Sequence, residues 1–201
     1  MNNAYRPNCL VCKNSGVFNS EIYSGFTSQR FEYLKCENCG LGWISNPNTN
    51  FDSIYDIKYY QGVGADLSIN YWDEMFPGLD TLNRKLRRVE YQGIHKTLRK
   101  NTTVGRDLLL RHLDFGGGLG GLVSFLIGKD CESVLFEEGF ASEIAIKHGV
   151  PCVQNLASIS LNCITAIEVF EHLIDPDEAV KSFAGALEIG GILLITTGNL
   201  S

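Results

Sequence analysis

The sequence predicts an α/β protein in which a doubly wound, mainly parallel sheet follows a small cysteine-rich segment. Three observations support this prediction. Short apolar runs alternate with amphipathic runs over residues 113–201, which is typical of parallel strands joined by helices. A glycine-rich loop follows the first of these runs, and two Cys-x-x-Cys pairs lie near the N-terminus. Composition divides the chain into a cysteine-rich segment (1–48), an aromatic and then basic helical connector (49–112) and the sheet domain (113–201).

Four strands are predicted in the last third of the chain. Residues 108–115 form an apolar run that ends in glycines. Residues 133–137, 163–169 and 192–197 are further apolar runs of strand length. Because each is separated from the next by a helical pattern, we expect the strands to be parallel.

Three helices are predicted between these strands. Apolar spacing indicates helices over 120–127 and 141–148, the second ended by Gly149. Asp175-Pro176 is typical of an N-cap followed by the first helical position. This third helix is expected to stop at Gly190-Gly191. Its expected apolar face carries Val180, Phe183 and Leu187.

The overall composition indicates a folded protein outside the membrane. The 201 residues carry a net charge of −6 with 44% hydrophobic and 20% charged residues, which excludes wholesale disorder. Apolar stretches such as residues 191–195 are too short to span a bilayer. The first residues lack the apolar core of a signal peptide. We expect a soluble, cytoplasmic protein with no membrane partner.

A basic run over residues 84–112 holds nine of the 17 Lys and Arg residues. The simplest interpretation of this run is the solvent-exposed face of a helix whose apolar stripe is buried. The stripe would consist of Leu79, Leu82, Leu86 and Val89. A nucleic-acid patch is the alternative, but no aromatic side chains are interleaved for base stacking. With an acidic chain, we expect no nucleic-acid partner.

The two cysteine pairs, Cys9/Cys12 and Cys36/Cys39, are separated by 23 residues. Two such turns can present four thiolates in a tetrahedron, which predicts a structural zinc site, and Gly40 suits the tight turn. Four unrelated thiols or a redox pair are the alternatives, although neither pair lies in a βαβ pattern. A four-sulfur site has no open position and would stabilise rather than catalyse.

The glycine loop follows the strand at Leu113 and fits two templates. Gly116-x-Gly118-x-x-Gly121 matches a dinucleotide fingerprint, with Glu137 placed as the ribose-binding acid. Asp114-x-Gly116-x-Gly118-x-Gly120 matches the acid-led loop of class I methyltransferases. A tight turn without a ligand is the third interpretation, and the loop alone does not choose among them.

The second half of the chain carries a more specific resemblance. The segments Thr165-Ala-Ile-Glu-Val-Phe-Glu-His-Leu-Ile-Asp-Pro176 and Leu187-Glu-Ile-Gly-Gly-Ile-Leu-Leu-Ile-Thr-Thr-Gly-Asn199 resemble class I S-adenosylmethionine-dependent methyltransferases with a Rossmann-like sheet. The most similar branch contains ubiquinone-biosynthesis O-methyltransferases and bacterial sugar methyltransferases. Some of its members carry an N-terminal zinc segment, followed by a tyrosine-rich stretch to which Tyr59-Tyr60 is similar.

This resemblance implies S-adenosylmethionine as the cofactor. Asp114, Gly116, Gly118 and Gly120 would hold its methionine part, and Glu137, with Glu138 as a less favoured substitute, would bind the ribose hydroxyls. Asn155 would reach the adenine, and Ile167 and Glu168 would lie beside the sulfonium. The sequence departs from the family pattern at Asn162, where an aspartate is frequent, and at Gly198, where proline is common.

The cluster Glu168-x-x-Glu171-His172 leaves three interpretations open. Two carboxylates and an imidazole can bind one divalent ion, as similar motifs do in the ubiquinone O-methyltransferases and in small-RNA 2′-O-methyltransferases. In a metal-free site, His172 is a candidate base or substrate contact, with Glu171 beside it. In a purely structural role, Glu171 would cap a helical turn.

These observations predict a methyltransferase that acts on a small molecule such as a sugar, a sugar nucleotide or a quinone- or phenol-like acceptor. The alternatives are an NAD-dependent oxidoreductase and a non-catalytic, zinc-stabilised module. The methyltransferase fold has two more strands after residue 197, so we expect this chain to be the cofactor-binding fragment of a longer protein, with a partial sheet domain over 113–201.

Overall fold

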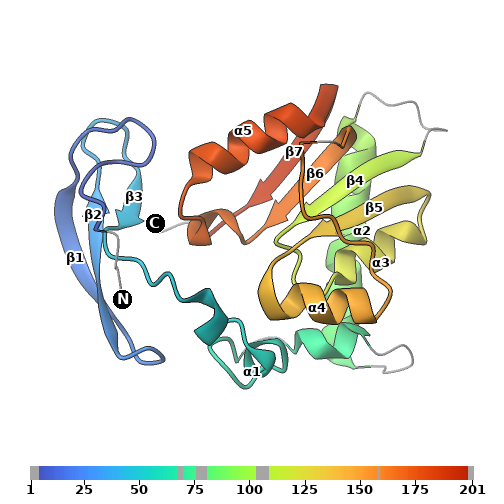
Figure 1. Ribbon diagram of the computed structural model, residues 1–201, viewed down its shortest axis with the longest axis horizontal. Helices are drawn as coiled ribbons and strands as arrows, with labels where there is room; N and C mark the ends of the chain where they lie inside the picture. Colours follow the sequence, from blue (N-terminus) through green and yellow to red (C-terminus); the bar gives the residue numbers. More distant parts are fainter. Residues whose placement is uncertain (1–4, 68–69, 76–80, 103–108, 158, 199–201) are drawn as a thin grey trace. The chain divides into compact units, whose positions relative to one another are not determined.

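The computed structural model describes residues 5–67, 70–75, 81–102, 109–157 and 159–198. Contacts divide it into two compact units (Figure 1). The first comprises residues 1–51 and 174–178, and the second comprises residues 52–173 and 179–201. Of the residues mentioned above, Leu79, Leu108 and Asn199 lie outside the described residues.

The first unit contains a three-stranded antiparallel sheet in the order β1–β2–β3. Its strands are β1 (Val17–Ser24), β2 (Gln29–Lys35) and β3 (Gly42–Ile44). The buried cluster of this unit is small. It consists of Leu34, Trp43 and two of the paired cysteines, Cys9 and Cys36. Because so little apolar surface is buried, a crosslink or metal is expected to supply part of its stability.

The second unit contains a four-stranded parallel sheet in the order β5–β4–β6–β7. The strands are β4 (Leu110–Phe115), β5 (Cys131–Phe136), β6 (Leu161–Ile167) and β7 (Leu187–Thr196). The helices are α1 (Ile57–Tyr60), α2 (Leu82–Asn101), α3 (Gly121–Ile127), α4 (Gly139–Lys147) and α5 (Pro176–Ala186). Among the described residues, short 3-10 helices cover Tyr71–Met75 and Phe170–His172, and another covers Phe51–Ser53 where the two units join in sequence. The predicted doubly wound, Rossmann-like sheet is confirmed.

Helices cover both faces of this sheet (Figure 1). Leu98 of α2 and Leu126 of α3 pack on one face, against Leu110 and Cys163. Phe183 of α5 packs on the other face. Since β5 and β6 flank β4 on opposite sides, the chain changes direction at β4, and ligands of such sheets bind beyond the carboxyl ends of the strands at this point.

The observed bounds of β6 differ from the predicted range, 163–169. β6 ends at Ile167 rather than at residue 169, because Glu168 adopts a left-handed backbone with φ 53°. Between α4 and β6, an isolated parallel bridge pairs Leu135 with Cys152. By contrast, the predicted capping is confirmed at Asp175, which accepts a hydrogen bond from the backbone N–H of Glu178 at 3.1 Å.

The predicted end of the last helix is wrong. α5 ends at Ala186, and β7 begins directly at Leu187. Val180, expected on the buried face, is exposed, whereas Phe183 is fully buried. The register of β7 against β6 shifts between Leu187 and Ile192, so the two glycines between them belong to an irregularity within a strand and do not end a helix.

The predicted apolar stripe of α2 is also wrong. Leu82, Leu86 and Val89 are all more than 60% exposed. The buried face instead carries Tyr91, Ile94 and Leu98. These larger side chains pack on α3 and the sheet, and the helix is therefore rotated relative to the sequence prediction.

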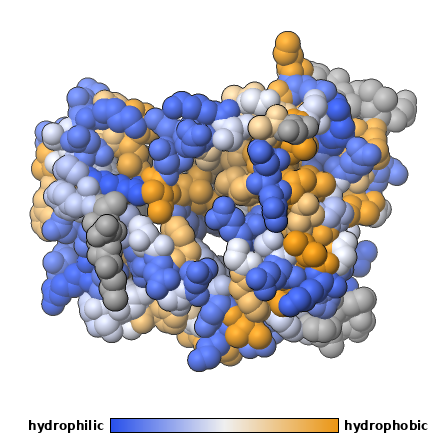
Figure 2. Space-filling model, in the orientation of Figure 1, coloured by the Kyte–Doolittle hydropathy of each residue, from blue (hydrophilic) through white to orange (hydrophobic). Residues whose placement is uncertain are grey.

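The surface mixes hydrophilic and apolar residues. On the face shown in Figure 2, hydrophilic residues cover much of the area, with small groups of apolar residues between them. None of the helices among the described residues is both long and apolar enough to cross a membrane.

Candidate active site

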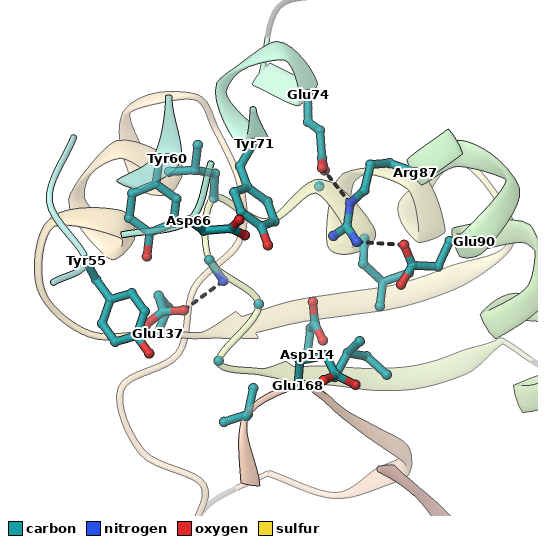
Figure 3. Close-up of a pocket in the computed structure, with 18 of the residues that line it drawn as sticks. Tyr55, Tyr60, Asp66, Tyr71, Glu74, Arg87, Glu90, Asp114, Glu137 and Glu168 are labelled. Carbon is teal, nitrogen blue, oxygen red and sulfur yellow. Dashed lines mark hydrogen bonds and ion pairs between the residues drawn. The ribbon is translucent and has the colours of Figure 1, made fainter. Parts of the chain in front are cut away.

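A cavity of about 570 Å³ lies at the carboxyl ends of β4, β5 and β6. Adjacent parallel strands end at the same edge of the sheet, so residues far apart in sequence meet here. The cavity is lined by most of the predicted site residues, namely Asp114, Gly116, Gly118, Glu137, Ile167, Glu168, Glu171 and His172. Figure 3 shows the carboxylates of Asp114, Glu137 and Glu168 around the glycine loop.

The glycine loop turns sharply between β4 and α3. Gly116, Gly118 and Gly120 all have a left-handed backbone, with φ of 70°, 58° and 81°. At Gly120 a side chain is also excluded by space, because an added Cβ would lie 2.7 Å from a methyl group of Val150. Gly120 precedes α3 and does not line the cavity. Its role in the loop is to turn the chain, while Gly116 and Gly118 face the cavity.

Glu137 follows β5 directly and folds back onto the glycine loop. Its carboxylate accepts a hydrogen bond from the backbone N–H of Gly118 at 2.7 Å (Figure 3). It also accepts one from the backbone N–H of Glu138 at 2.9 Å. Burial raises the pKa of Glu137, and these hydrogen bonds partly oppose the rise. Glu138 is exposed and lies outside the cavity lining, so of these two acids Glu137 is the one that lines the cavity.

Asp114, near the end of β4, is a buried carboxyl group at the floor of the cavity. Its side chain is only 3% exposed, and Thr165 donates a hydrogen bond to Oδ1 at 2.6 Å. Burial raises the pKa of Asp114 to about 7, while the Thr165 hydrogen bond and the charge of Arg87 lower it. Such a group changes its charge near neutral pH, which is typical of functional sites.

Arg87 of α2 enters the same cavity, which the sequence analysis did not predict. Its guanidinium pairs with Glu74 at 2.8 Å and with Glu90 at 2.6 Å (Figure 3), and it lies over the rings of Tyr71 and Tyr91. The side chain of Glu74 is 7% exposed and that of Arg87 is 19% exposed. The pair is therefore a shielded ion pair and not part of a solvated basic face. A signal was present in the spacing, since Arg87 continues the stripe of Tyr91, Ile94 and Leu98.

Tyrosines form one wall of the cavity. Tyr55, Tyr59, Tyr60 and Tyr71 contact one another through ring pairs 4.9–6.2 Å apart. Tyr55 also lies edge-on to the imidazole of His172, at 6.1 Å between ring centroids. Burial raises the pKa of Tyr55 to about 12 and raises the pKa of Tyr60 as well, so these hydroxyls remain neutral at physiological pH. Of these four tyrosines, the resemblance in sequence involves Tyr59 and Tyr60.

Glu168, Glu171 and His172 lie beyond β6 at the open side of the cavity. The backbone N–H of Glu168 donates to the carbonyl of Thr196 at 3.0 Å, which fixes its left-handed conformation. Glu171 accepts a hydrogen bond from the Thr197 hydroxyl at 2.9 Å. Burial tends to raise the pKa of Glu171, but backbone hydrogen bonds and the hydrogen bond from Thr197 outweigh it, so the pKa is lowered. Over the described ranges, these three residues do not form a convergent set of metal ligands.

Asn155, predicted to reach the adenine, does not line the cavity. It is exposed, and its side-chain oxygen accepts a hydrogen bond from the backbone N–H of Ala157 at 2.8 Å. Asn162, one of the departures from the family pattern, is buried in β6 and donates a hydrogen bond to Glu188 at 2.8 Å. Neither asparagine contributes a side chain to the cavity as the structure has it.

The four predicted metal-ligating cysteines converge in the first unit. The sulfur atoms of Cys9, Cys12, Cys36 and Cys39 all lie within 4.8 Å of one another. Two of the separations are 3.5 Å and 3.3 Å, near the spacing of about 3.8 Å that a tetrahedron of Zn–S bonds requires. The backbone N–H of Gly40 donates to the carbonyl of Cys36, and Gly40 has φ 79°, as the tight turn requires. Thiolates in this arrangement fit zinc.

A solved methyltransferase structure shares this fold, and a second one is similar in part. The plantazolicin methyltransferase BpumL, solved with a pentazolic desmethylPZN analog and SAH, is 13% identical over 58% of this chain and 50% of its own, with a TM-score of 0.50. The amino pentose methyltransferase CalS10 from Micromonospora echinaspora, solved with SAM, is 17% identical over 56% of this chain and 51% of its own, with a TM-score of 0.49. The chain therefore spans about half the length of these structures. Among curated proteins, none matches the sequence.

A family comparison covers more than half of the chain. The sequence model of the family described as "Methyltransferase domain" matches residues 82–201. The matched region contains the glycine loop, Glu137 and the Glu168–His172 cluster, which meet at the cavity. The chain therefore belongs to the methyltransferase domain family.

Proposed function

We propose that this chain binds S-adenosylmethionine in the cavity and transfers its methyl group to a small-molecule acceptor. The observation that carries the proposal is the charge of the lining. Seven carboxyl side chains face one guanidinium, that of Arg87, and Arg87 is itself paired with Glu74 and Glu90. An excess of negative charge attracts a cationic ligand, and S-adenosylmethionine carries a sulfonium and an ammonium group.

The contact between Glu137 and the glycine loop argues against a dinucleotide cofactor. In dinucleotide-binding loops the second glycine lets the backbone approach the pyrophosphate, and this position is Gly118. Its N–H is directed at the Glu137 carboxylate, so a pyrophosphate there would meet a buried acid. This contact favours the methyltransferase over the NAD-dependent oxidoreductase. Titration with NADH, followed by its fluorescence, is expected to show no saturable signal.

The lining suggests how the cofactor would be held. Asp114 and the loop from Gly116 to Gly120 would surround its methionine part, and Glu137 would accept hydrogen bonds from the ribose hydroxyls. Ile167 and Glu168 would lie beside the sulfonium. When bound, S-adenosylmethionine supplies a methyl group that is already activated for displacement, so the work of the protein is to align the acceptor and exclude water.

The acceptor would enter beside Tyr55 and His172. For an oxygen or nitrogen nucleophile, the bond from nucleophile to methyl forms as the sulfur–methyl bond breaks. The acceptor's proton passes to the imidazole of His172, and the sulfur retains the electron pair of its broken bond. Glu171, held by Thr197, would orient or stabilise the imidazolium. No step of this proposal requires a second metal ion at Glu168, Glu171 and His172.

The charge of the lining also restricts the acceptor. Glu168 and Glu171 would repel the diphosphate of a sugar nucleotide, so a neutral or cationic acceptor, such as an amino sugar or a phenol, is favoured. Transfer of a radiolabelled methyl group to matched panels of amines, phenols and sugar nucleotides tests this. Turnover confined to sugar nucleotides would contradict the proposed acceptor class, and absence of turnover on every panel despite cofactor binding would favour the non-catalytic module.

His172→Gln tests the proposed base once an acceptor is known. We expect kcat to fall roughly 100- to 10,000-fold, with an unchanged dissociation constant for S-adenosylhomocysteine. His148→Gln is the matched control, because His148 is exposed at the end of α4 and lies outside the cavity lining. Equal kcat values for the two variants would show that His172 is not the base.

A further inference from the structure

Four buried polar side chains form a continuous chain beneath the cavity floor. They are Ser133 of β5, His112 and Asp114 of β4, and Thr165 of β6. His112 Nδ1 lies 2.7 Å from Ser133 Oγ, and His112 Nε2 lies 2.9 Å from Thr165 Oγ1. Thr165 Oγ1 lies 2.6 Å from Asp114 Oδ1. Of the four, only Asp114 lines the cavity.

The sheet register explains how these residues meet. His112 is paired with Ser133 across β4 and β5, and Asp114 is paired with Thr165 across β4 and β6. His112 and Asp114 are two residues apart and therefore point to the same face of β4. That face is covered by α2 and α3, which keeps water away from the chain.

When Asp114 is ionised, the hydrogen bonds among these four side chains all run in one direction, toward the Asp114 carboxylate. An ionised Asp114 only accepts, so the Thr165 hydroxyl donates to it and must accept from His112. Burial lowers the pKa of His112 to about 3, so the imidazole is neutral. It then carries its proton on Nε2 and accepts at Nδ1 from the Ser133 hydroxyl. With Asp114 ionised, this direction gives each of the four side chains a hydrogen-bond partner.

We propose that Thr165 and His112 are positioning residues, which hold the Asp114 carboxylate ionised and in place for the cofactor. The inference rests on the proposed function, because it needs Asp114 to contact S-adenosylmethionine. Hydrogen bonds in a buried, aligned chain strengthen one another. The hydroxyl of Thr165 therefore donates more strongly because His112 donates to it.

Other charges around Asp114 make this donor important. Burial is the main cause of the raised pKa of Asp114, and the charges of Glu137 beyond β5 and of Glu74 in the Tyr71–Met75 helix raise it further. Against these, only Thr165 and Arg87 of α2 lower it, while Tyr91 of α2 faces it as a neutral hydroxyl. Without the Thr165 hydroxyl, the pKa of Asp114 would rise and the carboxyl group would be protonated at pH 7.

The test is the pH dependence of S-adenosylhomocysteine binding to the full chain, measured by calorimetry from pH 5.5 to 9. For the wild type, we expect affinity to fall about tenfold per pH unit below the pKa of Asp114. In Thr165→Val this midpoint should move up by about one pH unit, with affinity lowered about fivefold at pH 7 and largely restored at pH 9. Thr165→Ser keeps the hydroxyl and should restore the midpoint, and His112→Phe should move it in the same direction by less.

Cys163→Ala is the matched control for packing. Cys163 is fully buried on the same face of β6, so this variant should lower the melting temperature without moving the midpoint. An unmoved midpoint in Thr165→Val would overturn the inference while leaving the proposed function intact. A wild type that binds no S-adenosylhomocysteine at any pH would instead contradict the proposed function. If Thr165→Val does not fold, the His112→Phe midpoint and the histidine tautomer, read by ¹⁵N NMR, decide. An Nδ1–H tautomer of His112 would overturn the direction of the chain.

Discussion

Asp114 is subject to opposing requirements at the scale of a single residue. A charge at the cavity floor would hold a cationic cofactor, but burial disfavours that charge and raises the pKa to about 7. In the unfolded chain the group titrates near its ordinary value of 3.8. Between these values the folded state binds a proton that the unfolded state has lost, so the contribution of Asp114 to stability falls as pH rises from about 4 to 7.

The variant Asp114→Asn isolates this effect. The amide can still accept from Thr165 and has no charge to desolvate. We expect the free energy of unfolding of the cofactor-free variant, minus that of the wild type, to be near zero at pH 4 and to grow by up to about 4 kcal/mol at pH 8, at about 1.4 kcal/mol per pKa unit. Urea denaturation across this range measures it.

The difference between the two proteins is needed because His112 acts in the opposite direction. Its pKa is lowered by burial, so the unfolded state binds the extra proton, and the contribution of His112 to stability falls as pH drops from about 6.5 towards 3. A pH-independent difference between Asp114→Asn and the wild type would show that Asp114 is not a destabilising charge in the folded protein.

Single residues also show the limits of prediction from sequence. Asp114, Glu137 and the loop glycines were found because their spacing within one strand–loop–helix unit is fixed by local geometry. Arg87 was assigned to a solvated helix face, because its partner Glu74 lies 13 residues away in a separate helix and no periodicity connects the two. The series of hydrogen-bonded side chains that links Ser133 to Asp114 depends on how the strands pair. A single sequence does not specify this pairing.

At the scale of elements, the Arg87–Glu74 pair fastens α2 to the Tyr71–Met75 helix. Removing one member of a shielded ion pair leaves the other buried and uncompensated, which costs about 3 kcal/mol or more. We expect Arg87→Met to lose about this much free energy of unfolding, and Arg87→Met/Glu74→Gln to recover a large part of it. Guanidinium denaturation of the two variants tests this. A double variant that is no more stable than Arg87→Met would contradict the pairing.

The two cysteine pairs, Cys9/Cys12 and Cys36/Cys39, can be tested for metal binding. We expect about one zinc ion per chain, bound by four sulfurs, and a cobalt-substituted protein with the absorption of a tetrahedral thiolate site. Cys36→Ser should lose the metal and unfold the first unit, which has little other core. Cys152→Ser is the control, because Cys152 lies outside the cluster. Equal metal content in the two variants would exclude the site.

Elements were predicted well where local signals agree. The strands β4, β5 and β6 and the cap at Asp175 lie within a few residues of their predicted positions. The junction between α5 and β7 is not predicted correctly. Helical apolar spacing continues through Leu187 in the sequence, whereas in the structure Leu187 pairs with Leu161 of β6. On α2 two apolar stripes compete, and packing against α3, which the sequence does not show, decides between them.

At the scale of the whole molecule, the order of the strands explains why the site could be predicted in outline. Residues that follow β4, β5 and β6 must meet at one edge of a parallel sheet whose direction changes at β4. The sheet therefore collects the glycine loop, Glu137 and the Glu168–His172 cluster without further information. The tyrosine wall and α2 were not predicted because they reach the cavity from outside the sheet.

Calorimetric titration of the full chain with S-adenosylhomocysteine tests whether the cavity binds the cofactor through Asp114. We expect saturable binding of about one molecule per chain at pH 8, lost in Asp114→Asn, together with no binding of NADH. Absence of binding in a folded wild type, or binding that is unchanged in Asp114→Asn, would contradict it.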